Sequence, residues 1–298
     1  MTQAKRLFKD ALAHRGMSVL SALPGFLVSL VVLGLFLKSR AILAVQPLSR
    51  LIFGSSWHPL RGEFGLFPFI SGTIWVTLTA LILAVPVSIL TAIYLSEFAP
   101  RFVRESARPI IDVLAGLPSV VFGVWGVLLV VPFVGRVLAP LFGVSSSGYS
   151  VLAAGIVLAI MIFPTIIHIS LEVFASIPLS LREASLSLGA TRWETARHVV
   201  LRKGSQGILA ASVLGFSRAF GETMAVLMVA GNVPAIPKSL FDPGYPLPAL
   251  IANNYGEMMS IPRYDSALML AALVLLAVVL FFNVLARRIL IRAERRSR

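Results

Sequence analysis

Long apolar segments separated by short polar ones are the dominant pattern of this sequence. A helix needs about 20 mainly apolar residues to cross the hydrocarbon core of a bilayer. Segments of this length and character occupy residues 19–37, 68–94, 110–134, 152–174, 206–230 and 266–286. Prolines that should kink the helices containing them are Pro86, Pro118, Pro132 and Pro164. We therefore predict an all-α, polytopic membrane protein with six transmembrane helices.

The composition supports this prediction. Hydrophobic residues make up 57% and charged residues 13% of the 298 residues, whereas soluble domains are about half apolar and about a quarter charged. The first apolar segment, 19–37, is longer than the core of about 7–15 residues in a typical signal peptide. We interpret it as an uncleaved span, with a cleaved signal peptide as the alternative. The chain has no cysteine, which excludes disulfides and thiolate metal sites.

Lysine and arginine are concentrated in alternate polar segments. Of the 26 such residues, 18 lie in the two terminal tails and in segments 95–109 and 175–205, whereas 7 lie in the intervening loops. The positive-inside rule places the larger group in the cytoplasm, so the net charge of +13 is a topology signal rather than evidence for nucleic-acid binding. We predict a cytoplasmic N-terminal segment 1–18, a six-span domain 19–290 and a basic cytoplasmic tail 291–298.

Segment 175–205 has the pattern of two short helices joined by a glycine turn. Ser180–Glu183 and Thr191–Glu194 both fit the capping box, in which a hydroxyl and a carboxylate satisfy free amides at a helix start. Gly189, between them, suits the left-handed position after a helix end. A DNA-binding helix-turn-helix has similar spacing, but this segment is joined to a membrane span at each end. A solvated amphipathic loop is the other alternative.

This segment resembles the EAA loop of ABC importer permeases. The matching residues are Glu183-Ala184-Ser185, Gly189 and Val199-Val200-Leu201. In that family the loop forms the coupling helix that docks in a groove on the ATPase subunit, so the resemblance assigns coupling to Glu183, Ala184 and Gly189. Two positions depart from the family pattern, because Ser185 replaces an alanine and Arg202 stands where proline is usual.

Four further segments resemble the PstC-type permease subunits of phosphate-specific ABC importers. They are Trp57-His58-Pro59, Gly65–Thr73, Asp112–Gly123 and Gly221–Val226. The resemblance extends over nearly the whole chain and implies a type I ABC importer permease fold that translocates inorganic phosphate across the bacterial inner membrane. It also implies a PstA-type second permease, two cytoplasmic PstB-type ATPases and a periplasmic phosphate-binding protein as partners.

The residues themselves indicate that ATP is bound by another chain. No lysine here follows a glycine, so the Gly-x-x-x-x-Gly-Lys phosphate-binding loop is missing from the sequence. No arrangement of nucleophile, base and acid can be argued either. We expect a non-catalytic membrane subunit without a cofactor, and ATP hydrolysis in a separate subunit.

Arg218 and Glu222 are the charged residues of the apolar segment 206–230. A central arginine costs about 2.5 to 3.5 kcal/mol on insertion scales, so something must compensate for it. Four residues apart on one helix, the two side chains could pair, and a self-neutralising pair is the structural interpretation. In the functional interpretation both line the substrate path, where the forked donors of Arg218 attract an oxyanion. In the family, the corresponding charged residues are implicated in translocation.

The remaining polar residues of interest give weaker signals. Asp112 follows Pro109 near the start of the third apolar segment, where an acid would cap the helix through its dipole; a gate is the alternative. The histidines lack metal-ligand spacing and receive no site: they are His14, His58, His168 and His198.

Two other classes of function remain open. An ABC permease for another oxyanion, such as sulfate or molybdate, would share all the general features above, and only the resemblance favours phosphate. A secondary transporter or membrane enzyme would work without an ATPase, and the EAA-like loop argues against it. Whether the permease pair is a hetero- or a homodimer is not encoded in these patterns.

Overall fold

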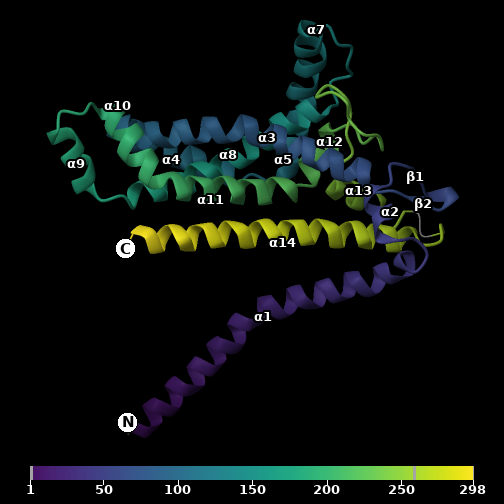
Figure 1. Ribbon diagram of the computed structural model, residues 1–298, viewed down its shortest axis with the longest axis horizontal. Helices are drawn as coiled ribbons and strands as arrows, with labels where there is room; N and C mark the ends of the chain where they lie inside the picture. Colours follow the sequence, from purple (N-terminus) through teal and green to yellow (C-terminus); the bar gives the residue numbers. More distant parts are fainter. Residues whose placement is uncertain (1–2, 258–259, 298) are drawn as a thin grey trace.

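The protein is a bundle of long helices, seen in a computed structural model that describes residues 3–257 and 260–297 (Figure 1). The long helices are α1 (Gln3–Leu43), α3 (Phe67–Ile93), α4 (Arg101–Gly116), α8 (Val151–Ala175), α11 (Leu201–Phe220) and α14 (Tyr264–Ser297). Shorter helices are α2 (Leu48–Phe53), α5 (Ser119–Trp125), α6 (Val131–Phe133), α7 (Ala139–Leu141), α9 (Leu179–Ser187), α10 (Arg192–Thr195), α12 (Met224–Val229) and α13 (Leu247–Asn254). Two short strands, β1 (Trp57–His58) and β2 (Glu63–Phe64), pair antiparallel.

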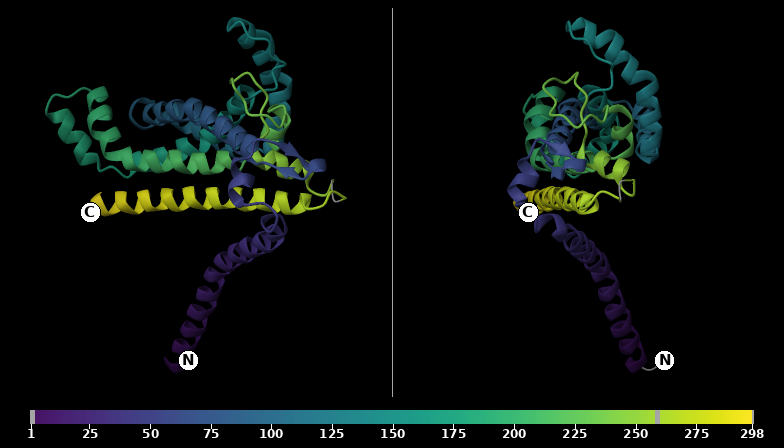
Figure 2. Two further views of the ribbon diagram at one scale, coloured as in Figure 1. Left: turned by 45° about the vertical axis from the view of Figure 1, so that its right-hand side comes forward. Right: turned by 90° about the vertical axis from the view of Figure 1, so that its right-hand side faces the viewer.

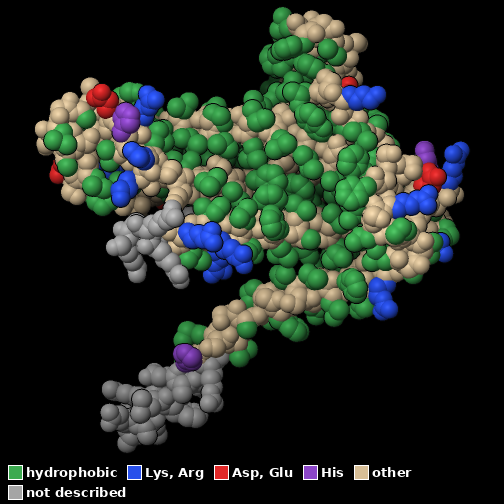
Figure 3. Space-filling model, in the orientation of Figure 1, with side chains coloured by type: hydrophobic (Ala, Val, Ile, Leu, Met, Phe, Trp, Pro, Cys, Tyr) green, Lys and Arg blue, Asp and Glu red, His purple; other side chains and the backbone are tan. Residues whose placement is uncertain are grey.

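Five helical segments of the described chain are long and apolar enough to cross a membrane. They are Gly16–Leu43, Phe67–Phe98, Ser119–Leu141, Val151–Ala175 and Tyr264–Ile289. Each overlaps a predicted span, which confirms the all-α, polytopic character. Hydrophobic side chains cover the middle of the molecule, and charged ones gather toward its two ends (Figure 3). This distribution fits a bilayer band around the bundle.

The predicted continuous fifth span, 206–230, is wrong. α11 ends at Phe220, α12 begins at Met224, and the residues between them are not helical. α11 nevertheless runs beside α14 along the long axis of the molecule (Figure 1), so the chain crosses the same layer in two pieces. Glycine at 221 lowers the helical propensity at this point.

The predicted third span, 110–134, is also interrupted. α4 ends at Gly116, and Leu117 is extended (φ −66°, ψ 135°) before Pro118 and the start of α5. A residue before proline is disfavoured in the helical region, so Pro118 breaks the helix instead of kinking it. Pro86 and Pro164, by contrast, lie inside the continuous helices α3 and α8.

Wider π-helical turns occur where the ordinary helical hydrogen-bond ladder is disturbed. Four are present in the described chain: Tyr94–Phe98, Gly126–Val130, Val134–Leu138 and Ala196–Val200. The second and third flank Pro132, which has no N–H to donate. Local π adjustment re-satisfies backbone groups that a proline frees within a membrane helix.

The core of the bundle is the close packing of α3 against α8. Small buried residues on both helices, including Ala80, Ala84, Ala153 and Gly155, let the backbones approach. Such small-residue contacts are the usual way in which membrane helices associate. A second cluster lies at the β1/β2 end, where Trp57 packs edge-on against Phe69 with ring centroids 4.9 Å apart.

α1 is the outlying element of the fold. It contacts α14 near the β1/β2 end, while its first half projects away from the bundle (Figures 1 and 2). Its apolar residues from Met17 to Leu37 are largely exposed, as expected for a helix that contacts lipid or another membrane subunit. The free ends of α1 and α14 both point toward the end of the molecule that carries α9 and α10 (Figure 1).

Gly155 provides a test of the α3–α8 packing. A Cβ at this position would lie 2.5 Å from Thr79 Cγ2 and 2.8 Å from Thr79 Cβ, whereas one at Gly34 in α1 would meet nothing within 4 Å. Overpacking costs about 1–3 kcal/mol, which exceeds the gain of about 0.5–1 kcal/mol from replacing a helical glycine by alanine. We expect Gly155→Ala to lower the Tm of the purified protein and Gly34→Ala to leave it unchanged or raise it. Equal Tm values for the two variants would contradict this account.

Candidate functional site

The break between α11 and α12 places Arg218 and Glu222 in different surroundings. Arg218 lies in the last turn of α11, whereas Glu222 follows Gly221 in the non-helical link. The Glu222 carboxylate accepts a long hydrogen bond, 3.5 Å, from the Ala225 N–H in the first turn of α12. This position resembles an N-cap, where a carboxylate satisfies a free amide. The Glu222 carboxylate thus faces the start of α12 and not the last turn of α11.

The expected pair between Arg218 and Glu222 is not formed within the described chain. Arg218 instead donates a hydrogen bond of 2.5 Å from Nη1 to Thr165 Oγ1 of α8. The reason is the helix break, because side chains four residues apart face each other only on a continuous helix. Arg218 is exposed in the isolated subunit, and its remaining donors are available to another ligand.

A second polar contact lies one helical turn along α8 from Thr165. His168 Nε2 is 3.0 Å from Asp112 Oδ1 of α4. Thr165 and His168 are three residues apart and therefore share a face of α8. The side chains of His168 and Asp112 are 38% and 64% exposed. Arg218, Thr165, His168 and Asp112 thus follow one another along the surface of α8 toward its α9 end. We call these four residues the polar line.

The structure corrects the expectation for Asp112 and extends that for His168. α4 begins at Arg101, so Asp112 lies in its C-terminal half and does not cap its N-terminus. The sequence predicts no site at His168, yet its partner in the structure is a carboxylate on a neighbouring helix. The signal available in the sequence was the spacing of Thr165 and His168 on one face of an otherwise apolar helix. Nowhere in the described chain do three acidic or histidine side chains gather closely enough to hold a metal ion.

The coupling-loop candidate folds as two helices around Gly189. α9 ends at Ser187, and Gly189 adopts the left-handed conformation with φ of +85°. The predicted capping box at Thr191 is confirmed: its N–H donates to Glu194 Oε2 (2.7 Å), and its hydroxyl accepts from the Glu194 N–H (3.2 Å). The Thr191 hydroxyl also donates to Glu194 Oε2 (2.9 Å). The hydrogen bonds that this carboxylate accepts from the Thr191 N–H and hydroxyl lower the pKa of Glu194 from its usual 4.5.

The predicted capping box at Ser180 is wrong. α9 begins at Leu179, directly after Pro178, so Ser180 and Glu183 lie inside the helix and no side chain caps its start. Pro178 itself occupies the N-cap position with a non-helical backbone (φ −55°, ψ 135°). Glu183 and Ala184 are both exposed on α9, as a docking helix requires.

Both departures from the EAA pattern have a structural account. The Ser185 hydroxyl lies 2.9 Å from the Thr195 hydroxyl and joins α9 to α10. Arg202 lies in the first turn of α11, which continues from α10 through the π-helical turn Ala196–Val200. The chain therefore leaves the loop as an uninterrupted helix without a proline.

Several large apolar side chains of this loop are exposed among charged ones, although the loop lies beyond the membrane-spanning helices. Its exposed large residues are Leu179, Leu181, Leu186, Leu188 and Trp193, with Leu188 89% exposed. An exposed apolar patch on a polar background marks an interaction site.

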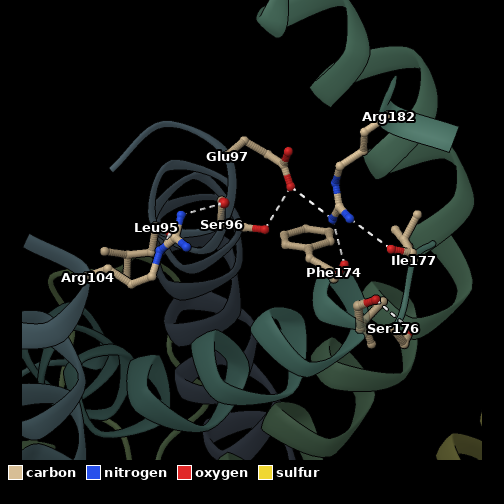
Figure 4. A network of polar contacts seen from close by, with 9 residues as sticks. Leu95, Ser96, Glu97, Arg104, Phe174, Ser176, Ile177 and Arg182 are labelled. Atoms are coloured by element: carbon tan, nitrogen blue, oxygen red, sulfur yellow. Dashed lines mark hydrogen bonds and ion pairs between the residues drawn. The ribbon is translucent and has the colours of Figure 1, made fainter. Parts of the chain in front are cut away.

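A partly buried polar network, which the sequence did not predict, connects the inner side of this loop to the bundle. Arg182 of α9 pairs with Glu97 in the π-helical turn that ends α3, with Nη2 and Oε1 3.1 Å apart (Figure 4). Arg182 also donates to the carbonyl oxygens of Phe174 and Ile177. In the sequence, Arg182 is marked only by its position directly before Glu183. Its partner Glu97 lies 85 residues earlier, so spacing along the chain does not predict the pair.

Comparison with known proteins agrees with these features. Residues 84–296 match the family described as "Binding-protein-dependent transport system inner membrane component". The chain belongs to this family. It is thus a multi-pass inner-membrane component of such a transport system.

The relatives and solved structures extend the match. The chain is 36% identical to the phosphate transport system permease protein PstC of Xylella fastidiosa strain 9a5c, over 99% of this chain and 96% of that protein. It is 39% identical to the probable ABC transporter permease protein YqgH of Bacillus subtilis, over 84% and 80% of the two chains. A chain from a bacterial ABC transporter that imports alginate has the same fold, with a TM-score of 0.56 at 18% identity over 95% of this chain and 99% of that one. A chain of the MetNI methionine transporter, at 20% identity over 77% and 94%, gives a TM-score of 0.53.

Gly189 allows the loop conformation to be tested against a matched site. Gly189 and Gly143 both have positive φ and open space around them, but Gly143 lies in the loop after α7. A left-handed conformation costs a β-branched residue about 1–2 kcal/mol. We expect Gly189→Val to weaken co-purification of the ATPase subunit and Gly143→Val to leave it intact, while Gly189→Asn, which tolerates this conformation, retains it. Normal co-purification with Gly189→Val would contradict a role for the turn in docking.

Proposed function

We propose that the chain is one of two permease subunits of an ABC importer that carries inorganic phosphate into the cytoplasm. The observation that carries this proposal is the 36% identity to a phosphate transport permease over 99% of the chain. The fold alone does not select the substrate, since importers of methionine and alginate share it. We propose that a few polar residues in the membrane layer contribute to the selection of phosphate.

The proposed complex contains four kinds of component. A PstA-type permease would cover the exposed polar line on α8, and two PstB-type ATPases would hydrolyse ATP. A periplasmic protein would deliver phosphate. The exposed apolar surface of the α9–α10 loop supports ATPase docking there, with Glu183, Ala184 and Gly189 in the coupling helix. In this proposal the chain itself is non-catalytic and needs no cofactor.

The proposed orientation places the α9–α10 end in the cytoplasm. The segments with most lysine and arginine lie at this end, and the free ends of α1 and α14 point toward it (Figure 1). We retain residues 1–18 as a cytoplasmic segment, 19–290 as the permease domain with its coupling loop 175–205, and 291–298 as a cytoplasmic tail.

Reporter fusions test this orientation. Fusions after Phe64 and Ser147 should report a periplasmic location, and fusions after Arg104 and Arg296 a cytoplasmic one, because of the positive-inside rule. Alkaline phosphatase and a fluorescent reporter measure the two locations independently. A cytoplasmic signal from both Phe64 and Ser147 would refute the six-crossing topology.

Arg218 is the proposed phosphate ligand in the membrane layer. Its guanidinium is held at one corner by Thr165 and is otherwise exposed. Two forked donors match two phosphate oxygens, and the positive charge offsets the cost of desolvating the anion. Glu222 beside the helix break would hold Arg218 when the path is empty, after a rearrangement of the link. His168 and Asp112 continue the polar line toward the cytoplasmic end.

Removing the charges of Arg218 and Glu222 together tests whether Arg218 binds phosphate during transport. In Arg218→Met with Glu222→Gln, no unpaired charge remains in the membrane, so the subunit should still insert and assemble. We expect phosphate uptake to fall at least about tenfold, because one charge-assisted hydrogen bond is worth roughly 1.5–3 kcal/mol. Arg218→Lys keeps the charge without the fork and should retain part of the uptake. The measurement is labelled-phosphate uptake into vesicles that contain equal amounts of assembled complex.

Arg50→Met serves as the matched control, since Arg50 is exposed on α2 outside the membrane layer. Its uptake should equal that of the unmodified complex. Near-normal uptake by the double variant would exclude Arg218 and Glu222 from the substrate path. Uptake of sulfate or molybdate in place of phosphate by the unmodified complex would instead reject the proposed substrate.

A further inference from the structure

Arg182 makes the hydrogen bonds and the ion pair that join α9 to the ends of α3 and α8. Its side chain is 15% exposed, and that of its partner Glu97 is 12% exposed. No residue of α9 is buried, so α9 adds no buried apolar side chain to the packing of the bundle. The directional contacts between α9 and the bundle are polar, and Arg182 makes them.

Arg182 closes the C-terminal end of α8. Its Nη2 donates to the Phe174 carbonyl (2.7 Å), and its Nη1 donates to the Ile177 carbonyl (2.8 Å). The last carbonyls of a helix lack partners within the helix, and a cation at this end also interacts favourably with the helix dipole. The guanidinium thus ties α9 to the end of α8.

Glu97 ties the same guanidinium to α3. It lies in the π-helical turn Tyr94–Phe98 and also accepts a hydrogen bond of 2.8 Å from the Ser96 hydroxyl. Arg104 of α4 donates to the carbonyls of Leu95 and Ser96 in this turn. Figure 4 shows the two arginines on opposite sides of the turn, so the ends of α3, α4 and α8 meet α9 in one network.

We propose that Arg182 and Glu97 are positioning residues that transmit the movement of α9 to α3 and α8. The inference rests on the proposed role of α9 in ATPase coupling. Phe174 and Thr165 are nine residues apart on α8, about 14 Å along the helix. A displacement of the α8 end through Arg182 therefore reaches the partner of Arg218 along one continuous helix. Without the pair, ATP hydrolysis continues but the helices that carry the polar line no longer follow it.

The test removes both charges of the pair in the full complex. Arg182→Met with Glu97→Gln leaves no unpaired buried charge, and Arg182→Lys keeps the charge but loses the two-pronged contact. The matched control is Arg101→Met with Glu105→Gln, an exposed pair on α4 near the same end. Each complex is reconstituted in proteoliposomes with the loaded binding protein. The readouts are ATP hydrolysed and phosphate imported.

We expect the phosphate imported per ATP to fall about tenfold or more in the double variant, within the roughly 5- to 150-fold range of coupling between sites. Basal ATP hydrolysis and the amount of assembled complex should match the control. Arg182→Lys should give an intermediate ratio.

A normal ratio in an assembled double variant would overturn the inference. If the double variant fails to assemble, a normal ratio in Arg182→Lys would overturn it equally, because the pair would then serve assembly alone. Failure of the unmodified and control complexes to import phosphate would refute the proposed function instead, so the two failures are distinguishable.

Discussion

In the hydrocarbon layer every backbone N–H and C=O must find a partner within the protein, because water is absent there. This constraint makes the chain helical and makes each interruption of a helix conspicuous. In the link between α11 and α12, the Glu222 N–H donates to the Ala219 carbonyl and the Thr223 carbonyl accepts from the Leu227 N–H. The turns around Pro132 widen to the π form. Arg218 occupies the last turn before such an interruption, where its side chain can leave its own helix and contact α8.

Small side chains hold the centre of the bundle together, whereas a partly buried charged pair joins α9 to it. α3 and α8 approach closely through alanine and glycine, which makes the centre of the bundle hard to deform. α9, in contrast, has no buried residue, and its polar contacts include those of Arg182 with Glu97 and of the Ser185 hydroxyl with Thr195. A closely packed bundle that contacts α9 through a few directional bonds fits the proposed transmission of movement from α9 to α3 and α8.

The shared fold of importers with different cargo has a physical explanation. Membrane helices associate through packing of small residues, which is independent of what passes between subunits. Specificity can then depend on a few polar groups placed at helix breaks and on facing helices. In this subunit the groups we propose for that role are Arg218 and Thr165, with His168 and Asp112 beyond them.

The sequence by itself determined the all-α membrane class, the location of five apolar spans, the turn at Gly189 and the capping box at Thr191. These features follow from local composition and from hydrogen bonds within a few residues. Only the tertiary structure decided that Arg218 contacts Thr165 instead of Glu222, that Asp112 meets His168, and that Arg182 reaches Glu97. Each of these contacts joins residues on different helices, and the interruptions at Pro118 and Gly221 change which faces meet. Such contacts depend on the packing of the whole bundle, which local spacing does not encode.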